Sequence, residues 1–129
     1  MKILVIPSWY PPVGGSFFRE HSEGIHQQSY DVDVLVCEVR SMKKLTLKDI
    51  ISPAYRNRIT ESNENGLRVI REIYWKLPKN QILNAKRWTK NVCRLFDYYI
   101  KKYGKPDIIH VHCTLYAGYA ASKKKKKYN

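Results

Sequence analysis

Two glycines, Gly14 and Gly15, close a proline-rich loop (residues 8–15, SWYPPVGG) that follows the first apolar segment of the chain. A glycine at the start of a helix lets the backbone approach a phosphate, and the positive end of the helix dipole attracts the same group. Ser16 comes next and is a typical N-cap residue. The loop matches neither the dinucleotide pattern G-x-G-x-x-G nor a P-loop. Two interpretations stay open, a phosphate-binding loop and a plain turn that needs glycine.

Two histidines, His110 and His112, are separated by one valine near the end of a later apolar segment. We expect alternation along a strand to place the two imidazoles on opposite faces of a sheet. One would then face a ligand cleft and the other a layer of helices, and together they could not bind one metal ion. The alternative is a buried histidine bonded to the backbone. The sequence has no H-x-x-x-H, C-x-x-C or paired-carboxylate spacing, so we predict no metal site.

A third candidate is the basic face of an amphipathic segment at residues 82–103. Its positive side chains include Lys86, Arg87, Lys90 and Arg94, and two tryptophans, Trp75 and Trp88, lie nearby in the sequence. A basic, aromatic and amphipathic helix is typical of binding to an anionic membrane surface. The alternative is a helix that packs on the core and exposes its charged face to solvent.

These residues need a framework, and the hydrophobic pattern predicts one. Near-continuous apolar runs indicate strands buried on both faces, whereas apolar spacings of three and four indicate helices. The expected strands are residues 2–7, 31–37, 67–74 and 107–112, and the expected helices are 17–29, 82–103 and one beginning in 115–122. Phe17, Phe18, His21 and Ile25 are expected to point inward. Residues 39–66 are expected to form a long connecting segment with one short helix. Strand, glycine loop, helix and strand in succession predict an α/β fold, with a Rossmann-like parallel sheet and helices on both faces.

The charge of this 129-residue chain is unevenly distributed. Its net charge is +13, made up of −3 over residues 1–38, +12 over 39–105 and +4 over 106–129. This asymmetry predicts a surface that faces a polyanion, without deciding between nucleic acid, anionic lipid and a phosphorylated substrate. No apolar run reaches the roughly 18 to 20 residues that span a bilayer. The three cysteines are widely spaced, which favours reduced thiols. We expect a cytoplasmic protein.

Three strings make the sequence resemble the front of a family-4 glycosyltransferase. They are VIPSWYPPVGGSFFREHSEGI, DVDVLVCEV and PDIIHVHCTLYAGYAA, which lie within the first 39 residues and the last 25. The resemblance implies the GT-B fold, of which residues 1–129 would be a partial N-terminal, acceptor-side domain. It also implies a retaining transfer, without a metal, from a nucleotide-diphosphate sugar to a glycan, glycolipid or cell-envelope precursor.

The resemblance assigns roles to individual residues. Gly14, Gly15 and Ser16 would lie near the donor diphosphate, and His112 near the reaction centre as the catalytic residue. Tyr10 and Arg19 are acceptor-side candidates. The second Rossmann-like domain, with its pair of donor-binding carboxylates, is missing from this sequence, so the residues present would form half of a site. Apart from the resemblance, the basic face formed by Lys86, Arg87, Lys90 and Arg94 is expected to hold the enzyme at the inner face of the membrane, beside a lipid-linked acceptor.

Two other interpretations compete with the enzyme. One is a basic α/β module that binds nucleic acid or membrane without catalysis, although no RRM or helix-turn-helix pattern supports nucleic-acid binding, and we expect none. The other is a nicotinamide-dependent Rossmann enzyme. The missing glycine fingerprint weakens it, and Glu38 is a poor substitute for the usual acidic residue.

Overall fold

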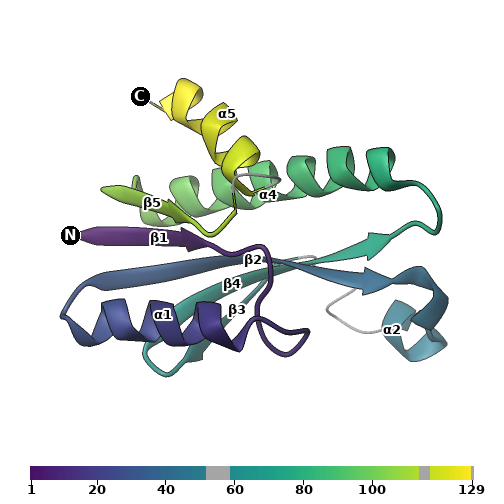
Figure 1. Ribbon diagram of the computed structural model, residues 1–129, viewed down its shortest axis with the longest axis horizontal. Coiled ribbons are helices and arrows are strands. Elements are labelled where there is room, and N and C mark those ends of the chain that lie inside the picture. Colours follow the sequence, from purple (N-terminus) through teal and green to yellow (C-terminus); the bar gives the residue numbers. More distant parts are fainter. Residues whose placement is uncertain (52–58, 114–116, 129) are drawn as a thin grey trace.

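The computed structural model describes residues 1–51, 59–113 and 117–128 (Figure 1). Its centre is a five-stranded sheet in the order β3-β4-β2-β1-β5. The strands are β1 (Lys2–Ile6), β2 (Asp31–Ser41), β3 (Ile59–Glu64), β4 (Leu67–Lys76) and β5 (Ile108–Val111). β1 pairs in parallel with both β2 and β5, and β2 pairs in parallel with β4. The predicted α/β fold is therefore confirmed.

β3 departs from the predicted parallel arrangement. It pairs antiparallel with β4 at the edge of the sheet, and Asn65 and Gly66 form the turn between them. Both turn residues have positive φ, 53° and 86°, as a tight hairpin turn requires. The β3 sequence ITESNE lacks an apolar run because most of its side chains are exposed. The hydrophobic pattern therefore does not reveal this strand within residues 39–66, although the Asn-Gly pair is a recognisable hairpin signal.

The rest of the segment 39–66 agrees in part with the prediction. β2 continues to Ser41, beyond its predicted end, because Val39, Arg40 and Ser41 stay in register with the end of β4. A 3-10 turn, η1 (Met42–Lys44), and one short helix, α2 (Leu47–Ile51), follow. The remainder, residues 52–58, lies outside the described residues.

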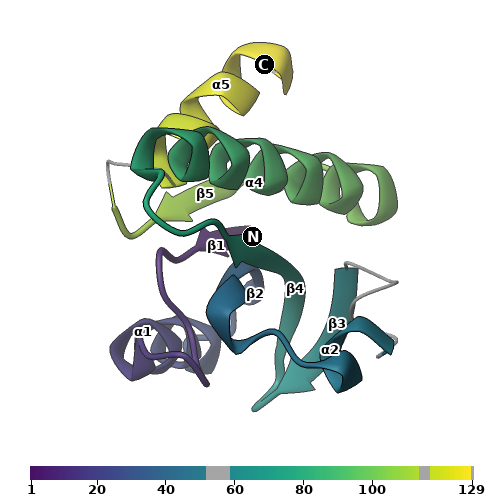
Figure 2. The same ribbon diagram turned by 90° about the vertical axis from the view of Figure 1, so that its right-hand side faces the viewer.

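Helices cover both faces of the sheet (Figures 1 and 2). α1 (Ser16–Gln27) lies on one face, and α4 (Gln81–Tyr103) and α5 (Tyr119–Tyr128) lie on the other. Alternation along the strands divides the core accordingly. Leu4 and Ile6 of β1 join the cluster beneath α4, whereas Ile3 and Val5 join the cluster on the α1 side. Each strand is therefore apolar on both faces, which explains the near-continuous hydrophobic runs.

The helix ends agree with the sequence to within a few residues. Asn80 caps α4 by accepting a hydrogen bond from the Leu83 N–H at 3.0 Å, and Gly104 ends it. At α1, Gly15 and not Ser16 occupies the N-cap position, so the expected serine cap is wrong. Phe17 is 68% exposed, so the prediction that it points inward is also wrong. The apolar stripe of α4 is buried as predicted, with Trp88, Val92, Leu95, Phe96 and Tyr99 in the core.

Candidate functional site

A pocket opens where the parallel strands end, at the edge of the sheet where ligands bind in open α/β folds. We call it the edge pocket, and it has a volume of about 520 Å³. Its lining comprises Ser8, Trp9, Val39, Tyr74, Lys76, Gln81, Asn84, Ala85, Trp88 and Cys113. These residues come from the ends of β2 and β4, the segments after β1 and β5, and the first turns of α4. The pocket thus joins four strands that are far apart in the sequence.

The edge pocket combines indole surface with a few polar groups. Trp9 is 60% exposed, whereas Trp88 is 7% exposed and belongs to the core beneath α4. The Ser8 hydroxyl is buried and has no hydrogen-bond partner among the described residues. By contrast, the Asn84 side chain accepts from the Tyr74 hydroxyl and the Leu77 N–H, so it holds the pocket wall together. Trp9 and Lys76 are exposed lining groups that can meet a ligand, and neither is among the site residues that the sequence predicts.

The glycine loop lies between β1 and α1 as predicted, and the structure gives Gly15 a local reason. Its φ is 77°, and a Cβ at this position would lie 2.6 Å from the Trp9 carbonyl oxygen. The absence of a side chain at Gly15 therefore lets the loop pack closely against the backbone of Trp9. Gly14 and Ser16 are exposed at the surface of the loop. Donor binding by Gly14, Gly15 and Ser16 stays a prediction.

The two acceptor-side candidates, Tyr10 and Arg19, lie apart from the edge pocket lining. Tyr10 is only 2% exposed and packs in the α1-side core, with the Arg71 guanidinium 5.2 Å from its ring centroid. Burial, reinforced by Glu64, raises the pKa of Tyr10 to about 12. Arg19 forms an ion pair with Glu23, one turn along α1, at 3.6 Å. In this arrangement Tyr10 is a core residue rather than a ligand-facing one.

His110 and His112 lie on the same face of the sheet, so the expectation of opposite faces is wrong. Side chains alternate along a strand with a period of two, and residues two apart therefore share a face. His110 pairs in register with Val5, whose side chain is on the α1 side. The two imidazole centroids are 4.8 Å apart, and His21 of α1 lies 5.2 Å from each. Both histidines thus face α1.

His112 is held tightly within this group. Its ring stacks on Phe18 with centroids 4.5 Å apart, and its Nε2 lies 3.2 Å from Nδ1 of His21. Burial, together with the neighbouring His110 and His21, lowers the pKa of His112 to about 4. Burial and His21 also lower the pKa of His110. The lowered pKa values favour the neutral form of both imidazoles.

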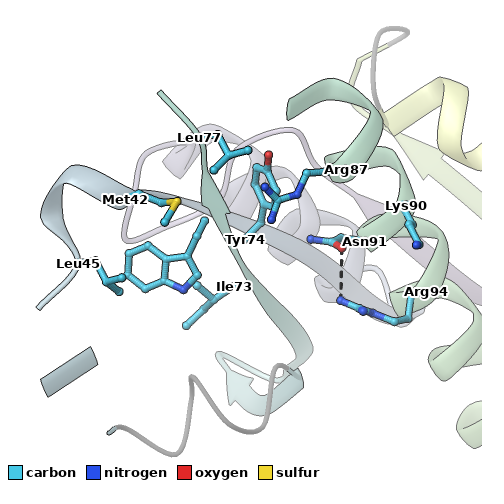
Figure 3. A pocket seen from close by; sticks show the side chains of 10 residues that line it. Met42, Leu45, Ile73, Tyr74, Leu77, Arg87, Lys90, Asn91 and Arg94 are labelled. Carbon is cyan, nitrogen blue, oxygen red and sulfur yellow. Dashed lines mark hydrogen bonds between the residues drawn. The ribbon is translucent and has the colours of Figure 1, made fainter. Parts of the chain in front are cut away.

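A second, cationic pocket of about 420 Å³ lies between α4 and the end of β4 (Figure 3). Arg87, Lys90 and Arg94 of α4 line one side, and Met42, Leu45 and Ile73 line the other. These three basic residues and Lys86 are exposed, as the membrane-facing prediction requires.

Two of the basic residues of the cationic pocket also have partners within the fold. Arg94 forms an ion pair with the buried Glu72 of β4, and the Arg87 guanidinium lies 5.5 Å from the Tyr74 ring centroid. Part of the positive charge on this face therefore stabilises the sheet–helix contact. Whether the same face binds a membrane stays a prediction.

The three cysteines are free, as expected. Among the described residues, no helix has the length and apolar character needed to cross a membrane. Comparisons of the chain with protein-family models, with curated proteins and with solved structures find no match.

Proposed function

We propose that this chain is the acceptor-side part of a retaining glycosyltransferase that uses a nucleotide-diphosphate sugar. The edge pocket is the observation that carries the proposal. It lies at the carboxyl ends of parallel strands, where open α/β folds bind their substrates. The glycine loop after β1 and His112 after β5 flank the same edge. The sequence resemblance supplies the reaction, and the pocket supplies a place for one substrate.

The lining of the edge pocket suits a sugar acceptor. Indole rings offer flat apolar surface that can also carry a polar edge, and Trp9 presents such a ring to solvent. Lys76 lines the same cavity, and its ammonium group is of the kind that binds an acceptor hydroxyl or phosphate. A mostly apolar cavity with a few polar groups is the usual composition of a small-molecule site.

In the proposed reaction the bond between the anomeric carbon and the donor phosphate oxygen breaks. A bond from the same carbon to an acceptor oxygen forms, and the acceptor proton leaves with the nucleoside diphosphate. His112 is the proposed catalytic residue near this centre, an assignment that comes from the sequence resemblance. Its ring packs against Phe18 and His21, so a hydrogen bond to a donor sugar would have to replace the contact with His21. A second domain would supply the remaining donor contacts. Because both reactants must be held in register, the 129-residue chain alone should show little transfer.

The test is transfer from labelled nucleotide sugars by the product of the full-length gene, with the 129-residue chain assayed beside it. Trp9→Ala should raise KM for the acceptor, and His112→Ala should lower kcat. His26→Ala is the matched control, because His26 lies on α1 outside the edge pocket and bonds the Tyr30 carbonyl. Equal rates for the chain and the full-length protein would show that the donor site lies in residues 1–129. Failure of every nucleotide sugar to react would refute the proposed function.

The cationic pocket favours a second candidate, a peripheral membrane-binding module. Each basic residue near an anionic surface contributes about 1 kcal/mol, an effect that salt weakens. Co-sedimentation with neutral and anionic liposomes at low and high salt tests membrane binding. The variant is Lys86→Gln/Lys90→Gln, because neither lysine has an ion-pair partner among the described residues. Binding that requires anionic lipid and is lost at high salt supports membrane association. Binding that ignores lipid charge and salt refutes it.

A further inference from the structure

We propose that His21, His110 and His112 form a binding site for one divalent transition-metal ion, with Zn²⁺ as the best-matched ion. Each imidazole offers one nitrogen, and the three nitrogens lie within 4.8 Å of one another. The site is argued from these three side chains; it shares His112 with the proposed function but does not rest on it.

The backbone brings the three histidines together from two elements. His110 is on β5, opposite Val5 of the central strand β1, and His112 follows two residues later on the same face. His112 remains attached to the sheet, since its N–H donates to the Ile6 carbonyl at 3.4 Å. His21 belongs to α1, the helix that covers this face, and lies three residues after Phe18. Two ligands are thus fixed by the sheet and the third by a packed helix.

The distances suit a zinc ion. Zn–N bonds of 2.0–2.1 Å in a tetrahedral arrangement place the ligand nitrogens about 3.3 Å apart. Nδ1 of His21 and Nε2 of His112 are 3.2 Å apart, so these two atoms already have the required separation. The largest nitrogen–nitrogen distance in the group, within 4.8 Å, needs a contraction of roughly 1.5 Å to reach the same value. The proposal requires the His21 and His110 rings to turn toward His112, which itself stays stacked on Phe18.

The hydrogen bonding of the group indicates which nitrogens could bind a metal. Nε2 of His112 faces His21, whereas Nδ1 of His112 is buried without a partner in the part of the chain that the structure describes, so Nε2 is the candidate ligand atom. Without a metal, one of the facing nitrogens of His21 and His112 donates its hydrogen and the other accepts it. A metal ion would instead bind a lone pair on each of these nitrogens, with the hydrogen of each ring on its other nitrogen. Imidazole nitrogens favour Zn²⁺, Cu²⁺ and Ni²⁺ over Mg²⁺ and Ca²⁺, and three protein ligands leave a fourth position for water.

The competing explanation is a purely aromatic cluster. Phe18 stacks on His112, and Phe17 stacks on His21 with centroids 6.4 Å apart. Such packing would hold the imidazoles together without any ion. The same packing would preorganise a metal site, so the two explanations differ in whether the folded chain binds a metal through these three rings.

The experiment is a titration of the chelator-treated chain. Zn²⁺ binding is measured by calorimetry against a competing chelator, and Co²⁺ binding by the visible absorption of a four-coordinate ion. We expect one ion per chain. His21→Ala, His110→Ala and His112→Ala should each weaken binding by at least tenfold, since even residues that only support metal ligands contribute about 10- to 100-fold. His26→Ala is the control and should bind as the unaltered chain does, because His26 bonds the Tyr30 carbonyl outside the cluster.

A second measurement needs no variant and so does not depend on how the variants fold. The imidazole nitrogen NMR signals of the unaltered chain are followed as Zn²⁺ is added. Shifts confined to three of the four histidines, with His26 unchanged, support the site. No binding, equal shifts at all four histidines, or a thiolate absorption band with Co²⁺ that disappears after cysteine alkylation would each overturn it.

Discussion

Replacing Gly15 by alanine should destabilise the fold before it affects any ligand. Gly15 adopts a left-handed conformation with φ 77° and ψ 34°, which costs a non-glycine residue about 1–2 kcal/mol. The added Cβ would also lie 2.6 Å from the Trp9 carbonyl oxygen and 2.7 Å from its carbonyl carbon. Because both atoms belong to the backbone, the loop itself must shift, and a strained local backbone of this kind costs about 1–3 kcal/mol.

A smaller effect acts in the opposite direction, since alanine restricts the unfolded chain and recovers about 0.4–1 kcal/mol. We therefore expect Gly15→Ala to lower the free energy of unfolding by about 1–4.5 kcal/mol. Gly24→Ala is the matched control within the following helix. A Cβ at Gly24 meets no heavy atom within 4 Å, so alanine there should stabilise the chain by about 0.5–1 kcal/mol.

The assay is urea unfolding of the 129-residue chain, followed by tryptophan fluorescence and circular dichroism. Parallel shifts of the midpoint with an unchanged slope would report stability alone. A Gly15→Ala chain as stable as the unaltered one would refute the steric argument and return the glycine to a ligand-binding explanation. If the expected loss is seen, nucleoside-diphosphate binding must be compared between chains under conditions where each is fully folded.

Two further predictions concern buried and surface hydrogen bonds. Tyr99→Phe should lower the free energy of unfolding in urea by about 1.5–3 kcal/mol, because the Tyr99 hydroxyl donates at 2.8 Å to the buried carboxylate of Asp33. The surface variant Tyr98→Phe should change it by less than about 1 kcal/mol. Equal losses for the two variants would contradict this prediction. Burial alone would raise the pKa of Glu61, but hydrogen bonds from two tyrosines and a lysine outweigh it and lower the pKa. The Glu61 carboxylate should therefore stabilise the fold above its unfolded pKa of about 4.3, and this contribution should be lost as the pH falls below that value. In an acid titration of unfolding, the stability of Glu61→Gln should consequently fall less steeply than that of the unaltered chain.

The architecture followed from local patterns. Apolar runs with no polar face indicated parallel strands between two layers of helices, and the spacing along residues 82–103 indicated a helix with one buried stripe. Both are read from neighbouring residues, because alternation and helical periodicity are properties of a short stretch of chain. β3 was missed for the same reason, since an exposed edge strand has no apolar pattern and is defined by its pairing with β4.

The sequence by itself thus determined the fold class and identified His112 and the glycine loop as positions of interest. Only the tertiary structure decided what surrounds them. His21 and His112 are 91 residues apart in the chain and meet because β5 pairs with β1 and α1 covers that face. The edge pocket likewise depends on the order in which four strands lie side by side. Strand order is set by long-range packing, which no local pattern of residues encodes, and it is this order that turns separate side chains into a site.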